Sequence, residues 1–268
     1  MTLQIRRALF LLISFCFATQ VQAWSNTEIQ WLYGDIKFPS NRADTKTSTF
    51  TLVNASGGDG WDTFFFIDRA TYNYDSQAGN NNEFVSKFFA NYSLSTLLDT
   101  DLSTGLLKDI GLTAGFKHAP EVDSLWIMPS LRLDFDLPGF RFANVRLGYY
   151  KHQWGGSQEA SHFSVLDETD SYMINFVWDY PFEIGSSKWN IGGFVEYIAS
   201  NTQTSNFGVT QKSSWVLAQP QIRLDLGHSL GHGEGKLFVG IEYQFWQNKL
   251  GNPAVDESAP QLLLAWSF

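Results

Sequence analysis

The sequence predicts an all-β protein, a 12-stranded antiparallel transmembrane β-barrel, and three observations lead to this fold class. First, short segments in which apolar and polar side chains alternate recur along the chain, as expected for strands with two different faces. Second, aromatic residues make up 16% of the chain, yet no apolar run after Ala23 reaches the ~20 residues of a membrane helix. Third, the last alternating segment ends on an aromatic residue, Phe268.

Residues 1–23 predict a cleaved secretory signal peptide. Arg6 and Arg7 precede an apolar run over 8–18, and Val21-Gln22-Ala23 is a small-residue cleavage pattern. The run is short for a membrane anchor, so cleavage is the better interpretation. The expected parts are therefore the signal peptide, 1–23, and an outer-membrane barrel, 24–268. Cys16 belongs to the signal, so the exported part has no cysteine and no disulfide framework.

The net charge argues against one class of partner. The chain holds 27 acidic and 18 basic residues, and the basic ones form no continuous stripe. Proteins that bind nucleic acid carry a basic patch that neutralises phosphates. We therefore expect no nucleic acid as a partner.

Twelve segments have the period of a strand and are separated by clusters of Gly, Asn, Asp, Ser and Pro. The predicted strands are 26–34, 47–56, 60–70, 83–93, 109–118, 123–136, 140–154, 171–181, 188–199, 212–226, 235–249 and 258–268. A short turn of helix is compatible with 95–108. An even strand number places both termini on the periplasmic side, with long polar extracellular loops such as 71–82 and 155–170 and short periplasmic turns such as 137–139 and 181–188.

The alternation assigns each side chain to lipid or to lumen. In the segment 123–136, Leu131 and Leu133 share an apolar face, while Arg132 and Asp134 lie on the opposite face. The same alternation in "WDTFFFIDRA" (61–70) mixes aspartates with phenylalanines on one face. Such a mixture suits a wet, narrow lumen. The candidate lumen residues are Asp62, Phe64, Phe66, Asp68, Lys87, Phe89, Asn91, Arg132, Asp134, Arg146, Tyr150, Glu196, Glu242 and Trp246.

These residue types suit the passage of a small flat solute. Aromatic rings stack on heterocycles, and ionisable groups hydrogen-bond to ring edges and sugar hydroxyls. A purely structural alternative is open for the charges, because pairs such as Asp134 with Arg146, or Glu242 with Arg223, would brace neighbouring strands. Phe64 and Phe66 are equally compatible with a packed plug.

Several long segments resemble one family. They are "TFTLVNASGGDGWDTFFFIDRA", "FVSKFFANYSLSTLLDTDLS", "SLWIMPSLRLDFDLPGFRFANVRLGYYKHQW", "YMINFVWDYPFEI" and the closing "LLLAWSF". In this order they resemble the nucleoside-specific channel-forming proteins of Gram-negative outer membranes, the Tsx-like or OmpK-type family. The resemblance implies a monomeric barrel of twelve strands that passes nucleosides through a narrow pore. It carries over site residues only for the segment 62–68.

Three other interpretations stay open. A surface receptor or structural barrel, for example a phage receptor, would have a closed lumen. An outer-membrane hydrolase would draw on His152, Ser157 and His162, but no third orienting group stands at a suitable spacing. A metal site at His228, His232 and Glu234 would need a helix where the sequence is rich in glycine.

The expected function is therefore facilitated diffusion of nucleosides or related small solutes across an outer membrane. We expect no enzymatic activity, no cofactor and no metal. The expected surroundings are outer-membrane lipid and lipopolysaccharide, with phage as a further partner at the extracellular loops.

Overall fold

The computed structural model describes residues 23–37, 44–73, 81–155, 165–205 and 207–268. The predicted signal peptide lies outside the described residues except for Ala23, and so do 38–43, 74–80, 156–164 and 206, all within predicted loops.

The described residues form one antiparallel sheet of fifteen strand segments. The first eight are β1 (Trp24–Lys37), β2 (Asp44–Gly58), β3 (Trp61–Tyr72), β4 (Asn82–Ser93), β5 (Leu107–Ala119), β6 (Ser124–Ile127), β7 (Ser130–Phe135) and β8 (Phe142–Trp154). The other seven are β9 (Val165–Glu168), β10 (Ser171–Ile184), β11 (Ser187–Ser205), β12 (Thr210–Ala218), β13 (Gln221–Asp225), β14 (Leu237–Gln247) and β15 (Glu257–Ser267).

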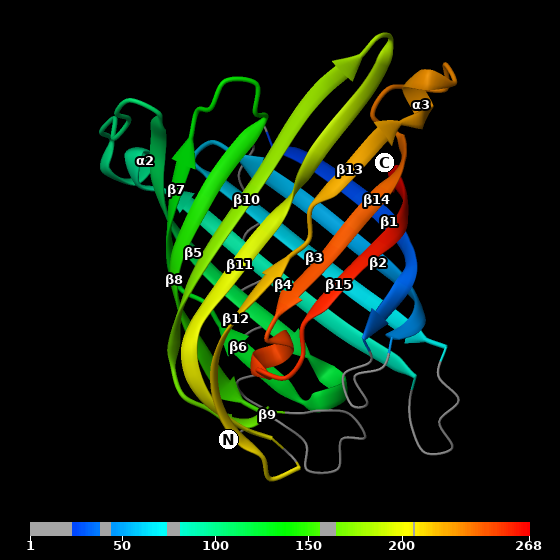
Figure 1. Cartoon of the computed structure of the whole chain (residues 1–268). Helices are drawn as coiled ribbons and strands as arrows, with labels where there is room; N and C mark the ends of the chain where they lie inside the picture. The colour runs from blue at the N-terminus through cyan, green and yellow to red at the C-terminus, as the bar shows by residue number, and fades with distance from the viewer. Residues whose placement is uncertain (1–22, 38–43, 74–80, 156–164, 206) are drawn as a thin grey trace.

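The sheet closes on itself as a barrel of twelve strands, as predicted (Figure 1). Successive strands pair around the ring, and the last strand, β15, pairs with the first, β1, from Glu28 opposite Ser267 to Gly34 opposite Gln261. Each of the twelve predicted segments falls on one barrel strand, but the loop predicted at 155–170 is partly wrong, because β9 lies inside it. Three barrel strands are interrupted and account for the additional segments: β6 with β7, β9 with β10, and β12 with β13.

Prolines mark two of these interruptions. Pro129 lies between β6 and β7, and Pro220 lies between β12 and β13. Proline has no N–H to donate to a sheet ladder. Its carbonyl still accepts, and Tyr149 and Tyr243 donate their backbone N–H groups to Pro129 and Pro220, each at 2.9 Å. The barrel therefore stays closed across both breaks.

The exterior of the barrel is apolar, which agrees with the alternation in the sequence. In β15 the exposed side chains include Leu262, Leu264 and Trp266, while the residues between them, such as Leu263 and Ala265, are buried. Exposed leucine, isoleucine and aromatic side chains also lie on β3, β7, β10 and β14. A belt of exposed apolar side chains around a closed barrel is the surface that a lipid bilayer requires.

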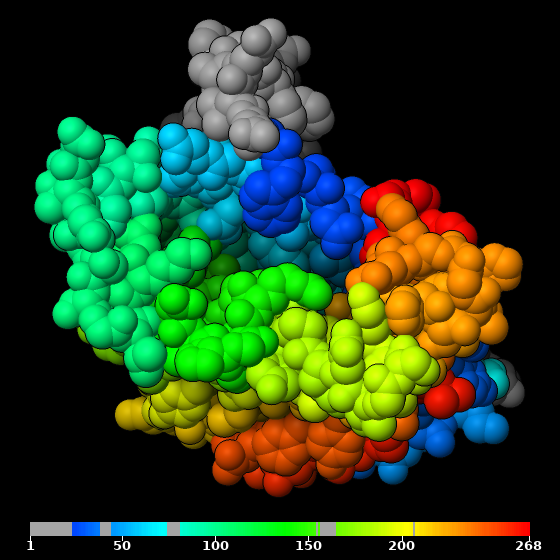
Figure 2. Space-filling view, turned by 90° about the horizontal axis from the view of Figure 1, so that it is seen from above, coloured from blue at the N-terminus to red at the C-terminus, as the bar shows by residue number. Residues whose placement is uncertain are grey.

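The two ends of the barrel differ. At the end where β3 and β11 begin, the connections range from two residues, 59–60, to thirteen, 94–106, and this end also carries two helices, α2 (Leu94–Leu98) and α3 (Leu226–Ser229) (Figure 1). Seen from this end, the turns surround a recess (Figure 2). The opposite end carries the two short 3₁₀ helices Pro120–Val122 and Lys249–Gly251. No helix in the described part of the chain is long and apolar enough to cross a membrane.

The structure confirms the helical turn expected within 95–108, since α2 lies there, and corrects the turn expected at 181–188. β10 continues to Ile184 and β11 begins at Ser187, so the connection is only Gly185 and Ser186. Pro181 is tolerated inside β10 because the pairing with β8 ends at Asp179, which leaves β10 a partner on one side only.

Candidate functional site

The interior of the barrel contains a cavity of about 770 Å³. All twelve barrel strands contribute to its lining. The lining extends from Trp24, Lys108 and Arg141 near the end with α2 and α3 to Glu121 and Leu250 at the opposite end. The cavity therefore follows the barrel axis.

Most of the predicted site residues lie along the wall of this cavity. Thirteen of the fourteen candidates line the cavity: Asp62, Phe64, Phe66, Asp68, Lys87, Phe89, Arg132, Asp134, Arg146, Tyr150, Glu196, Glu242 and Trp246. Asn91, the fourteenth, is buried in the wall, where it donates to Asp62 Oδ1 at 2.6 Å and accepts from Thr113 Oγ1 at 2.5 Å. Contact of any of these side chains with a solute stays a prediction.

In the segment 61–70, the rings of Phe64 and Phe66 line the cavity. Phe64 and Phe66 meet edge to face, with ring centroids 6.3 Å apart. Phe64 also packs against a buried aromatic cluster. At the end of the same face, Asp68 accepts a hydrogen bond from Thr51 Oγ1 at 2.5 Å. An aromatic wall and an anionic acceptor therefore lie side by side in the cavity.

An aromatic cluster lies in the half of the barrel away from α2 and α3. Trp126 stacks near Tyr150, with centroids 6.4 Å apart, and Tyr150 meets Trp215 edge to face at 6.0 Å. Trp215 in turn lies 5.4 Å from Trp246. These four rings come from β6, β8, β12 and β14, so they project inward from several sides of the barrel.

The predicted bracing pairs are wrong in their partners. Asp134 pairs with Arg132, at 2.9 Å, and not with Arg146. Arg132 also binds Asp62, at 2.7 Å. Arg223 binds Glu28 at 3.0 Å rather than Glu242. The arginine side chains are long enough to contact strands that are not their neighbours in the sheet. Arg132 on β7 contacts β3, and Arg223 on β13 contacts β1.

The Arg146 guanidinium is held by uncharged groups. It lies 4.6 Å over the ring of Phe89, and it donates to Asn175 Oδ1 at 3.0 Å. Within the described ranges no carboxylate lies at ion-pair distance from it, and its Nε has no hydrogen-bond partner. Lys117 is similar, since its Nζ lies 4.7 Å over the ring of Trp126.

One ion pair extends across the cavity. Lys87 Nζ, on β4, donates to both carboxylate oxygens of Glu196, on β11, at 2.9 and 2.8 Å. Both side chains are almost completely buried, with 6% and 1% exposure. Around the ring β4 and β11 are five strand steps apart on one side and seven on the other. The Lys87–Glu196 pair, called the crossbar below, is therefore close to a diameter of the barrel.

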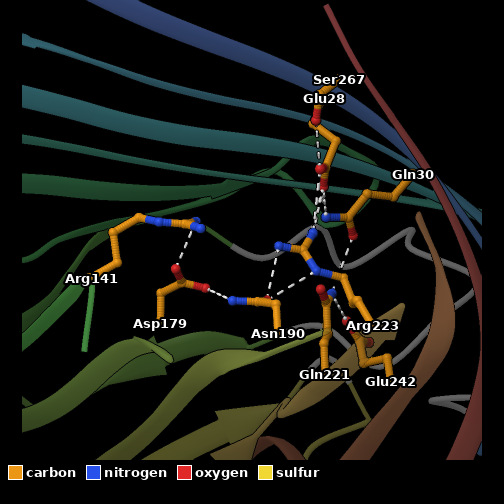
Figure 3. A network of polar contacts seen from close by, with 9 residues as sticks. All are labelled: Glu28, Gln30, Arg141, Asp179, Asn190, Gln221, Arg223, Glu242 and Ser267. Carbon is orange, nitrogen blue, oxygen red and sulfur yellow. Dashed lines mark hydrogen bonds and ion pairs between the residues drawn. The ribbon is translucent and has the colours of Figure 1, made fainter. Parts of the chain in front are cut away.

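A second set of polar side chains lines the wall (Figure 3). Glu28 is its centre and accepts from Arg223 at 3.0 Å, from Gln30 at 2.6 Å and from Ser267 at 2.9 Å. Arg223 also contacts Asn190, which donates to Asp179, and Asp179 pairs with Arg141 at 2.7 Å. This wall network ties the first and last strands, β1 and β15, to β13, β11 and β10.

Residue patterning missed part of this lining. Lys117, Trp126 and Trp215 are not among the candidates given above, although the alternation in 123–136 puts Trp126 on the same face as Arg132. All three line the cavity. The alternation that identified Phe89 and Arg132 would also have identified these residues on β5, β6 and β12.

The alternative sites have limited support. The ring of His152 lies tilted against that of Trp126, with centroids 5.1 Å apart, and its supposed partners Ser157 and His162 lie outside the described residues. His228 lies in α3, with its Nδ1 3.9 Å from Glu234. No group of three or more His, Cys, Asp or Glu side chains in the described ranges is arranged to hold a metal ion.

An apolar exterior, a closed ring and a cavity lined by aromatic rings and ionisable groups define a transmembrane β-barrel with a solute-sized lumen. No family model matches the chain, and no curated protein matches it. Among solved structures it is similar to the KdgM porin, with 9% identity, a TM-score of 0.48 and coverage of 91% of this chain and 99% of the porin. An outer membrane channel from Pseudomonas putida F1 has 9% identity, a TM-score of 0.47 and coverage of 94% and 97%. A structure titled "KdgM porin in complex with disordered oligogalacturonate" has 8% identity and a TM-score of 0.45, with coverage of 91% and 99%.

Proposed function

We propose that this protein is a monomeric channel in the outer membrane of a Gram-negative bacterium that lets nucleosides or closely related small solutes diffuse down their gradient. The observation that carries the proposal is the cavity of about 770 Å³ along the barrel axis, lined by rings and by ionisable groups. A flat heterocycle stacks on rings such as Phe64 and Phe66, while Asp68 accepts from its polar edge.

The mechanism needs contacts that are weak and repeated. A solute that binds tightly at one place leaves slowly, whereas several moderate sites in series allow passage. The lumen offers such a series, from Phe64 and Phe66 to Phe89 and then to the rings of Tyr150 and Trp246. No step consumes energy, because the concentration gradient drives the net flow.

The direct test is single-channel recording of the refolded protein in a planar bilayer, with uridine added to one side. We expect discrete current steps and brief, uridine-dependent interruptions. A barrel with a closed lumen, acting as a surface receptor or scaffold, gives neither. Steps without any effect of uridine would support a channel but contradict the nucleoside as its solute.

A further inference from the structure

The crossbar stands in the path of any solute. Lys87 and Glu196 are opposed across the ring, and both line the cavity. Because the two groups form an ion pair, the charge of each is compensated by the other. A solute that moves through this level of the barrel therefore passes against the pair or between its two members.

The surroundings of the crossbar are two facing rows of side chains. On one side, Phe66, Lys87 and Lys117 lie directly opposite one another on β3, β4 and β5. On the other side, Arg146, Asn175 and Glu196 lie opposite one another on β8, β10 and β11. Phe66 therefore supplies a ring at the level where Lys87 supplies a donor and Glu196 an acceptor.

Burial makes the crossbar selective. Separating a buried ion pair leaves two uncompensated charges in a poorly solvated place, which is costly unless new hydrogen bonds replace the old ones. Lys87 is donor-only, and ionised Glu196 is acceptor-only. A solute replaces both bonds only when it presents an acceptor to Lys87 and a donor to Glu196.

We propose that the Lys87–Glu196 crossbar is the selectivity filter of the channel and binds flat solutes that carry both a hydrogen-bond donor and an acceptor on one edge. This inference rests on the proposed channel function and specifies its solute class. Nucleobases with an N–H beside a carbonyl belong to that class, and rings that only accept do not.

The test compares two purines that differ by one methyl group. Theophylline has an N–H donor and carbonyl acceptors, whereas caffeine has the same rings and only acceptors. In the wild type we expect theophylline to interrupt the single-channel current at a concentration about tenfold lower than caffeine, the effect of one hydrogen bond to a charged group.

Replacing both members of the crossbar by methionine, Lys87→Met with Glu196→Met, keeps the side-chain lengths and removes the donor and acceptor. In this variant we expect both purines to act at the same concentration. The exchanged pair, Lys87→Glu with Glu196→Lys, restores a donor and an acceptor and is expected to restore the discrimination. The matched control is Glu28→Gln with Arg223→Gln, which neutralises a wall pair and is expected to keep the wild-type ratio.

Assembly of each variant is checked by the mobility of the unheated barrel on a gel, and Lys87→Gln with Glu196→Gln replaces the methionine pair if that pair does not assemble. For the glutamine pair we expect a ratio reduced at least about threefold, since its hydrogen bonds involve no charge.

Equal action of both purines on the wild type overturns the inference, and so does an unchanged ratio in the neutralised crossbar. Either result leaves the proposed function standing if uridine still interrupts the current, whereas loss of that uridine effect in the wild type contradicts the proposed function itself.

Discussion

Two ion pairs inside the barrel, Lys87–Glu196 and Arg223–Glu28, have the same chemistry but connect different things. The first joins strands five steps apart around the ring and crosses the cavity. The second joins β13 to β1, three steps apart, and is surrounded by amide and hydroxyl partners along the wall. All four side chains line the cavity, so the two pairs differ in their span and in their partners: the first bridges opposite sides of the ring, and the second is tied into a hydrogen-bonded network along one side.

The largest expected effect comes from removing the centre of the wall network. Glu28→Ala leaves Arg223 without its carboxylate and removes the acceptor of Gln30 and Ser267. We expect the free energy of unfolding to fall by about 3 kcal/mol, the scale for a buried pair that loses one partner. Urea unfolding in lipid vesicles, followed by tryptophan fluorescence, measures the change.

The control for that prediction is the neutral pair Glu28→Gln with Arg223→Gln, which leaves no charge unpaired and should cost less. The assigned role would be wrong if Glu28→Ala proved as stable as this double variant, or if it abolished the effect of uridine on the current in a barrel of unchanged stability.

The next largest effect concerns two rings that line the cavity. Phe64→Ala with Phe66→Ala removes two stacking faces, and we expect uridine flux at low concentration to fall about tenfold, given 1–3 kcal/mol per stacked base. Liposome swelling with uridine and with a simple sugar of similar size makes the measurement, and the sugar rate should not fall. Phe65→Ala is the matched control because its side chain lies on the opposite face of β3. Equal uridine flux in the double variant and the parent would remove these rings from the path.

A smaller effect is expected from one lumen charge. Asp68→Asn removes a carboxylate that lines the cavity, so the permeability of potassium relative to chloride should fall, by less than about twofold for one partly solvated charge. The change should shrink from low to high salt as screening increases. Reversal potentials in salt gradients measure it, and Asp101→Asn, which removes a fully exposed charge outside the cavity, should leave them unchanged. A shift that persists at high salt would mean that the lumen shape, not the field, has changed.

The sequence was sufficient for the fold because the period of two is set by the backbone itself. In β15 buried and exposed side chains alternate along the whole strand, and in 61–70 the alternation in the sequence puts Phe64, Phe66 and Asp68 on the face that lines the cavity. Contacts across the lumen are a different matter. Lys87 and Glu196 are 109 residues apart, and Arg132 and Asp62 are 70 apart. No local pattern relates such residues, because the closure of the ring alone decides which strands face each other.

The same limit explains the error at Pro181. The sequence predicts a turn there because proline cannot donate to a ladder. The structure continues β10 past this residue, because β8 begins only at Phe142, opposite Asp179, and no β8 residue lies opposite Pro181. Whether a strand has one partner or two at a given residue depends on the stagger between neighbouring strands, which the sequence of the strand does not contain.

The smallest expected effect is at an ion pair that lies outside the lumen. Lys188 binds Glu234 at 2.6 Å, with both side chains solvated, at 34% and 59% exposure. Lys188→Met should therefore change the free energy of unfolding by less than about 1 kcal/mol, and less still at high salt. Both variants, Lys188→Met and Glu28→Ala, are measured in the same urea experiment. The exposed Lys188–Glu234 pair has a shorter N–O distance than the buried Arg223–Glu28 pair, so the comparison separates the effect of burial from the effect of distance. A loss as large as that of Glu28→Ala would contradict the view that desolvation, rather than the N–O distance, gives the pairs inside the barrel their strength.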